Sequence, residues 1–203
     1  MTYPRFLTIA ATAAAVFVGG EAALAFVAFS NADLNLRSGP STHYPIVATT
    51  NHKDRLDVSG CLEDVSWCVV SWGGVEGWAS AEYIDVDETD GVKTLPLAKN
   101  DMGIPVVTYT AVDAVQPTFV GTVTPVSAYV EAISPPAAVT AFVSAQTIET
   151  VHVQGEVVVG AVLPETVPLF AIPQSKYTFS RVNGQNVVVD TSSRQVVYVH
   201  RSI

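Results

Sequence analysis

The segment from residue 30 to residue 86 contains five short apolar runs that are separated by turn signals. The runs have the length and alternation of β-strands, and they cover residues 34–37, 46–49, 56–60, 67–72 and 75–79. Gly73-Gly74, between the last two runs, predicts a tight hairpin. Strands this short cannot bury a core as a flat sheet, so they are expected to close, or nearly close, into a small barrel. The predicted fold class is mainly β.

The order of motifs in this segment resembles that of the bacterial Src homology 3 family. The matching residues are Asn35-Leu36-Arg37-Ser38-Gly39-Pro40-Ser41, Tyr44-Pro45-Ile46, Gly77-Trp78-Ala79 and Tyr83-Ile84. Ala79 stands where valine is commoner. The resemblance implies a small Src homology 3-like β-barrel over residues 30–86 that serves as a binding or targeting module, often toward cell-wall peptide.

The chain has two cysteines, Cys61 and Cys68, which lie at the end of one predicted strand and early in the next. In an oxidising compartment, an even pair this close indicates a disulfide across the hairpin. Two free buried thiols are the alternative. A structural zinc site is not expected, because it needs about four ligands and the nearest histidines do not have ligand spacing.

Residues 1–25 are typical of a secretory signal peptide. An uncharged apolar run over residues 6–18 follows Arg5, and Ala23-Leu24-Ala25 fits the small-x-small pattern for cleavage before Phe26. Cleavage after Ala28 is an alternative. The predicted location is therefore periplasmic or secreted.

An uncleaved membrane anchor is a further alternative, because the apolar stretch continues to Phe29. Glu21 interrupts that stretch, and a carboxylate in hydrocarbon costs a few kcal/mol. We therefore expect no stable membrane anchor after the signal is removed.

Residues 87–154 differ in composition from the segments on either side. Acidic residues cluster at its start, and prolines then recur at positions 96, 105, 117, 125, 135 and 136. This pattern predicts an extended linker, although the segment is too apolar for ordinary disorder.

Residues 155–203 are expected to fold as a second β module. Asn183-Gly184 between residues 177–182 and 185–189 is a strong hairpin signal, and residues 196–200 add a third strand of a meander. Residues 157–167 are expected to pack on this meander, since a meander alone is marginally stable.

The C-terminal segment also resembles a family of domains of unknown function in exported alphaproteobacterial proteins. The matching residues are Gly160, Leu163-Pro164, Val167, Ile172-Pro173, Tyr177, Asn183-Gly184, Val187-Val188-Val189-Asp190, Arg194, Val196-Val197 and Tyr198. This resemblance implies a location and no chemistry.

No recognisable catalytic centre is present in the sequence. The two cysteines are expected to be oxidised, the Gly-x-Ser-x-Gly pattern of serine hydrolases is absent, and no glycine-rich phosphate loop occurs. The histidines at positions 43, 52, 152 and 200 stand singly, and each is interpreted as a surface residue. We therefore expect no enzyme activity, no metal and no cofactor.

The aromatic residues of the barrel are the better candidates for a binding surface. Trp67 and Trp72 are five positions apart on one predicted strand, so they point to opposite faces and one should be exposed. Tyr44, one of these two tryptophans and Tyr83 are hypothesised to edge a shallow groove for peptide or sugar. Trp78 is interpreted as a core residue.

The net charge of −9 is unevenly distributed: −8 over residues 29–90, −3 over 91–159 and +2 over 160–203. An acidic protein should be repelled by nucleic acid, which is therefore not an expected partner. The asymmetry suggests that Arg181, Arg194 and Arg201 dock on Asp54, Asp57 and Glu63 of the barrel.

The function predicted from the sequence is a non-catalytic binding module of the cell envelope, with cell-wall peptide or an envelope protein as partner. A structural or stress-related envelope protein without a small-molecule ligand is the first alternative. An unrecognised cell-wall hydrolase is the second.

Overall fold

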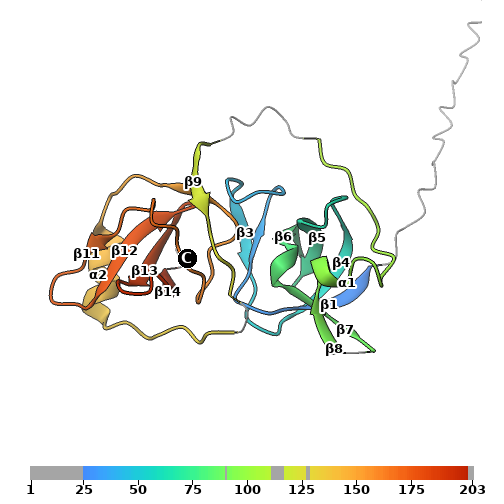
Figure 1. The fold of residues 1–203 in the computed structure, drawn as a ribbon, viewed down its shortest axis with the longest axis horizontal. Coiled ribbons are helices and arrows are strands. Elements are labelled where there is room, and N and C mark those ends of the chain that lie inside the picture. Colours follow the sequence, from blue (N-terminus) through green and yellow to red (C-terminus); the bar gives the residue numbers. More distant parts are fainter. Residues whose placement is uncertain (1–24, 90, 111–116, 127–128, 201–203) are drawn as a thin grey trace, which may run out of the picture.

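The computed structural model describes residues 25–89, 91–110, 117–126 and 129–200, which form two β-rich lobes side by side (Figure 1). The predicted signal peptide lies outside the described residues except for Ala25. In the described part of the chain, no helix is long and apolar enough to cross a membrane.

The N-terminal lobe is built on one antiparallel sheet of eight strands with the order β3-β2-β6-β5-β4-β1-β7-β8. The strands are β1 (Phe26–Ser30), β2 (Asn35–Arg37), β3 (Ile46–Thr49), β4 (Arg55–Cys61), β5 (Trp67–Trp72), β6 (Val75–Ser80), β7 (Ile84–Glu88) and β8 (Gly91–Thr94). A 3-10 turn, η1 (Ala81–Tyr83), and a short helix, α1 (Leu95–Ala98), complete the lobe.

The five strands expected from the sequence are all present, and the mainly β fold class is confirmed. In β4, Leu56 and Val58 are buried whereas Arg55 and Asp57 are exposed, as the alternating pattern requires. Gly73 and Gly74 both have positive φ and form the β5–β6 turn. Strands β1, β7 and β8 were not expected. Closure of the sheet into a complete barrel remains a prediction.

The predicted disulfide is confirmed. Cys61 and Cys68 face each other in the β4–β5 register and their sulfur atoms are bonded. The segment around Pro105 and Val107 also runs beside the disulfide, since the amide of Cys61 donates to the carbonyl of Pro105 and the amide of Val107 donates to the carbonyl of Cys61.

The C-terminal lobe contains a four-stranded antiparallel sheet with the order β11-β12-β13-β14, a helix, and a two-stranded parallel pair. Its elements are β9 (Phe119–Thr122), α2 (Ala137–Ala145), β10 (His152–Gln154), β11 (Phe170–Ala171), β12 (Tyr177–Val182), β13 (Gln185–Asp190) and β14 (Val196–His200). Asn183 and Gly184 make the predicted β12–β13 turn, with φ values of 49° and 83°.

The three consecutive valines of β13, Val187, Val188 and Val189, pack on both faces of the sheet. Val187 and Val189 face the main core, whereas Val188 faces a smaller cluster beneath α2 that includes Val143 and Phe179. The strand is therefore buried on both faces, which removes the usual alternation of apolar and polar residues.

The segment expected to be an extended linker, residues 87–154, carries β8, α1, β9, α2 and β10. It buries Leu95, Val123, Val143 and Val153. The domain boundaries derived from the sequence remain predictions.

One contiguous apolar core runs through both lobes. It joins Leu36 and Val58 of the N-terminal sheet to Val153 and Val187 of the C-terminal lobe. The two lobes therefore share a hydrophobic core, and their junction is where polar side chains are brought together.

Candidate functional site

A buried ion pair lies at the junction of the lobes. Arg37 of β2 and Glu156, which follows β10, have side chains that are 1% and 0% exposed. The guanidinium donates from Nε to Oε2 at 2.8 Å and from Nη2 to Oε1 at 2.6 Å. Its Nη1 donates to the carbonyls of Thr42 and Tyr44 at 2.9 and 2.8 Å. A charged pair this deeply buried needs further hydrogen bonds to be tolerated, and here each guanidinium nitrogen and each carboxylate oxygen has a partner.

Further hydrogen bonds extend the junction on both sides. The side-chain amide nitrogen of Asn35 donates to Oε1 of Glu156 at 2.7 Å, and the hydroxyl of Thr42 donates to the carbonyl of Val153 at 3.0 Å. The side chain of Asn183 accepts a hydrogen bond from the backbone amide of Val153 at 2.9 Å and donates one to the carbonyl of Val153 at 3.2 Å. A continuous polar network therefore runs from β2 through residues 153–156 to the β12–β13 turn.

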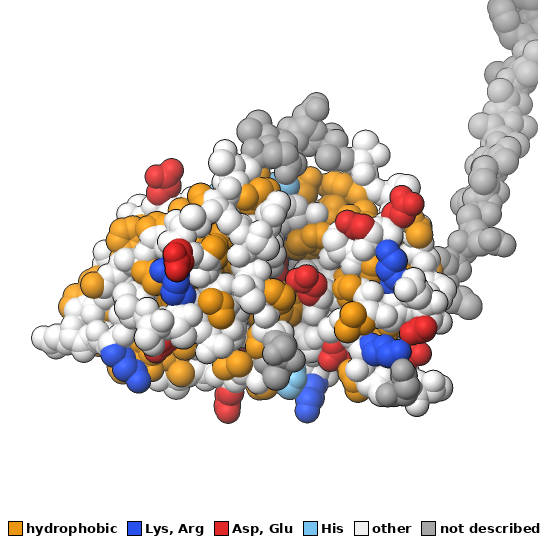
Figure 2. Space-filling view, viewed as in Figure 1, with side chains coloured by type: hydrophobic (Ala, Val, Ile, Leu, Met, Phe, Trp, Pro, Cys, Tyr) orange, Lys and Arg blue, Asp and Glu red, His pale blue; other side chains and the backbone are white. Residues whose placement is uncertain are grey.

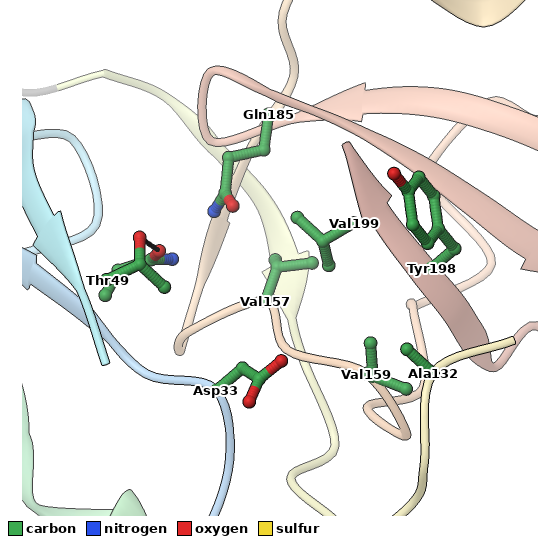
Figure 3. Close-up of a pocket in the computed structure, with 9 residues that line it drawn as sticks. Asp33, Thr49, Ala132, Val157, Val159, Gln185, Tyr198 and Val199 are labelled. Carbon is green, nitrogen blue, oxygen red and sulfur yellow. Dashed lines mark hydrogen bonds between the residues drawn. The ribbon is translucent and has the colours of Figure 1, made fainter. Parts of the chain in front are cut away.

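Two cavities flank this network. The larger, of about 570 Å³, is called the Tyr198 pocket and is lined by Asp33, Asn35, Thr49, Val157, Gln185 and Tyr198 among others. Figure 3 shows Gln185 extending toward Thr49 from the opposite side of the junction, with Val157 and Val199 forming an apolar wall.

The second cavity, of about 400 Å³, is called the histidine pocket. Its lining includes His43, His152 and His200, together with Arg37, Tyr44 and Gln185. Asn35, Thr49 and Gln185 line both cavities, so the two are neighbours. Side chains from both lobes complete each cavity.

The histidines were interpreted from the sequence as scattered surface residues, and for three of them the structure corrects this. His43 of the N-terminal lobe and His152 and His200 of the C-terminal lobe are partly buried around one cavity. Burial, together with the nearby charges of His152 and Arg37, lowers the pKa of His43 below its ordinary value. No spacing signal in the sequence could have found this group, because it is assembled by contacts between the lobes.

The fourth histidine, His52, lies elsewhere. Its ring stacks on Tyr129 with a centroid separation of 3.7 Å, beside a third cavity of about 330 Å³. Within the described residues, no group of three or more His, Cys, Asp or Glu side chains is placed to hold a metal ion.

The four residues proposed as a groove do not lie together at one described cavity. Tyr44 lines the histidine pocket, whereas Trp67 and Trp72 on β5 are partly buried and line none of the three cavities. Tyr83 is only 1% exposed, and its hydroxyl donates to the carbonyl of Glu156 at 3.4 Å. Tyr83 therefore belongs to the junction core and cannot edge a surface groove.

A different aromatic cluster surrounds Tyr44. The ring of Tyr109 meets those of Tyr44 and Trp78 edge-on, with centroid separations of 5.9 and 5.4 Å. The ring of His43 packs on that of Tyr44 with a centroid separation of 4.2 Å. A hydrogen bond with Tyr109 is the main reason that the pKa of Tyr44 is raised. Trp78, interpreted as core, is partly buried. Tyr109 was missed because it lies in the segment expected to be a linker.

The proposed docking of basic C-terminal residues on the acidic barrel is not what joins the lobes. Arg194 donates to the carbonyls of Leu163, Pro164 and Val167 within its own lobe. Asp57 pairs with Arg55 on the same strand. The inter-lobe pair that is observed, Arg37–Glu156, has the opposite polarity, and Arg201 lies outside the described residues. On the face shown in Figure 2, charged side chains are scattered among apolar ones over both lobes.

Comparison with known families identifies both modules. Residues 32–85 match the model of the bacterial SH3 domain, and residues 142–201 match that of a domain of unknown function, DUF1236. Both resemblances read from the sequence are confirmed, and the second match begins at α2, within the segment expected to be a linker. No curated protein matches the chain.

Proposed function

We propose that this chain is an exported, non-catalytic binding protein of the cell envelope that holds a peptide of the cell wall, or of an envelope protein, at the junction of its two lobes. Bacterial SH3 domains are often cell-wall binding modules, and neither matched family is a known catalytic domain. The observation that carries the proposal is the histidine pocket, which contains Tyr44 of the SH3 motif and is completed by the second lobe.

Strand β3 supports a peptide ligand in particular. It stands at one end of the sheet order, and Ile46 and Val47 on it are 37% and 45% exposed. Pro45 and Ile46 also line the histidine pocket. An exposed edge strand beside a cavity suits an extended peptide, which adds main-chain hydrogen bonds to the edge and places a side chain or terminus in the cavity.

One observation supports export, and a second supports the position of the cleavage site. The Cys61–Cys68 disulfide fits an oxidising compartment. Strand β1 begins at Phe26, so cleavage before Phe26 leaves the whole strand, whereas cleavage after Ala28 would remove its first three residues. Because Ala28 is fully buried and pairs with Leu56, we infer that the cut falls before Phe26.

Co-sedimentation of the full chain, expressed with its own leader, with purified sacculi tests this function. Val47→Glu places a charge on the exposed edge of β3 and should weaken binding about tenfold, which corresponds to about 1.4 kcal/mol of binding free energy. Val92→Glu is the matched control, because Val92 is also an exposed valine (64%) but lies on β8 at the other end of the sheet.

Equal loss in both variants would show that retention is nonspecific. No retention of the unaltered chain would favour the structural alternative, and release of soluble cell-wall fragments would favour the hydrolase. Each of these results would overturn the proposed function.

A further inference from the structure

The histidine pocket contains polar atoms that nothing in the described part of the chain satisfies. Nε2 of His43, Nδ1 of His152, Nδ1 of His200 and Nε2 of Gln185 are buried and have no hydrogen-bond partner among the described residues. All four residues line this one cavity. A buried polar atom without a hydrogen-bond partner destabilises the fold, so four of them around one cavity require an explanation.

In two of these imidazoles, the other ring nitrogen already lies within hydrogen-bonding distance of a serine hydroxyl. Nδ1 of His43 lies 2.8 Å from the hydroxyl of Ser41, and Nε2 of His200 lies 3.0 Å from the hydroxyl of Ser144. These contacts orient the rings and leave the other nitrogen of each without a partner among the described residues. Gln185, 91% buried, is similarly confined, and its amide nitrogen can only donate.

The charges around the cavity favour an anion. No carboxylate is among its described lining residues, although the chain as a whole carries a net charge of −9. Arg37 is neutralised by Glu156 directly behind it, and Tyr44 is the other titratable lining group. The neighbouring Tyr198 pocket has one acid, Asp33, among its described lining residues. The net charge of the histidine pocket is therefore set by its three histidines.

We propose that the histidine pocket binds the carboxylate of a peptide, and that His43, His152, His200 and Gln185 donate hydrogen bonds to its oxygens. This inference rests on the proposed function for the peptide and adds the chemical group that is recognised. A carboxylate only accepts hydrogen bonds and carries the charge that protonated imidazoles attract. Binding should therefore tighten as the pH falls below the ordinary histidine value of about 6.5, because the pKa of His43 lies below that value.

The test uses the full chain and two probes, N-acetyl-alanyl-alanine with a free carboxylate and the same dipeptide with a C-terminal amide. Titration calorimetry at pH 5.5 and 7.5 should give about tenfold tighter binding of the carboxylate at the lower pH, and no such change for the amide. His43→Gln with His152→Gln should abolish the difference between the probes. His52→Gln is the control, because His52 stacks on Tyr129 outside this cavity.

A second measurement does not depend on any variant folding. In the unaltered chain at pH 5.5, saturating carboxylate probe should shift the ring proton resonances of His43, His152 and His200 and leave those of His52 unchanged. Equal affinity for the two probes, affinity independent of pH, or unchanged ring proton resonances of the three pocket histidines would each overturn the inference.

The outcomes also separate this inference from the proposed function. Retention on sacculi that survives His43→Gln/His152→Gln would leave the envelope function standing and remove the carboxylate site from it. Discrimination between the two probes without retention on sacculi would support the carboxylate site and overturn the cell-wall ligand.

Discussion

The two lobes treat buried charge in complementary ways. The N-terminal lobe buries a guanidinium, Arg37, without an acid of its own beside it, and the C-terminal lobe buries a carboxylate, Glu156. Each charge is buried and finds its oppositely charged partner only across the junction, and a buried charge that loses its partner is strongly destabilising. The apolar core is likewise shared. Two segments that match separate families are therefore expected to fold as one cooperative unit.

The largest expected effect comes from breaking the shared charge. Glu156→Gln leaves Arg37 buried without its partner and should lower the free energy of unfolding by about 3–5 kcal/mol. Thermal unfolding should show one transition that shifts as a whole, whether it is followed by tryptophan fluorescence, which reports the N-terminal lobe, or by far-UV circular dichroism.

Two controls accompany this variant. Asp57→Asn removes an exposed pair, in which Arg55 and Asp57 are 63% and 52% exposed, and should cost less than about 1 kcal/mol. Replacing both buried partners, Arg37→Met with Glu156→Met, should be less damaging than Glu156→Gln alone, because no charge is then left unpaired. Separate transitions for the two lobes would contradict their interdependence.

The disulfide offers a second way to test the coupling, since it lies in one lobe only. Replacing Cys61 and Cys68 by alanine should lower stability by about 2–3 kcal/mol, because the short loop between these two residues, seven positions apart in the sequence, is then unconstrained in the unfolded state. If the lobes are coupled, hydrogen exchange should increase in β13 of the C-terminal lobe as well as in β4 and β5. Increased exchange confined to the N-terminal lobe would show that the lobes unfold independently.

The two lobes also contain equivalent hairpin turns, which should respond alike. Gly74 and Gly184 have φ values of 82° and 83°, and a Cβ at either would meet nothing within 4 Å. Alanine at each position should therefore cost about 1 kcal/mol through backbone strain alone. Gly103→Ala is the control, since Gly103 has open space and no positive φ. Unequal effects of Gly74→Ala and Gly184→Ala in chemical denaturation would show that one turn is supported by its surroundings.

The sequence was informative wherever the signal was local. Cys61 and Cys68, and the Asn183-Gly184 turn, sit within a few residues of the structure they determine, and each was predicted correctly. The motif beginning at Asn35 was recognised, but the partner of its Arg37 was not. Glu156 lies 119 residues away, so the pairing exists only once both lobes have folded.

The candidate site could not be predicted for the same reason. His43 and His152 come from different lobes, and Tyr109 comes from a segment whose prolines are typical of a linker. Tyr83 was expected at the surface because aromatic residues often line grooves on small barrels, but the second lobe covers it. In hindsight, one signal was visible: Glu156 is a lone acid directly before three valines, an uncommon place for a solvated charge.

The smallest effect concerns a serine-bound aspartate in one turn of each lobe. Asp64, in the β4–β5 turn, accepts hydrogen bonds from the hydroxyl and amide of Ser66, and these bonds lower its pKa. Asp190, at the end of β13, accepts from the hydroxyls and amides of both Ser192 and Ser193, which lowers its pKa further, to about 2. Carboxyl titration by NMR should therefore place the midpoint of Asp190 below that of Asp64.

The sign of the effect on stability follows from these bonds. Because the folded-state pKa of Asp190 lies below its ordinary value of 3.8, the carboxylate stabilises the fold above about pH 4, and this contribution is lost as the pH falls toward 2. Ser192→Ala with Ser193→Ala should return the midpoint toward 3.8 and remove that part of the acid sensitivity, whereas Ser66→Ala should shift only Asp64. If the titration midpoint of Asp190 does not move in the double variant, the surrounding charge rather than the two serines keeps the Asp190 carboxyl ionised.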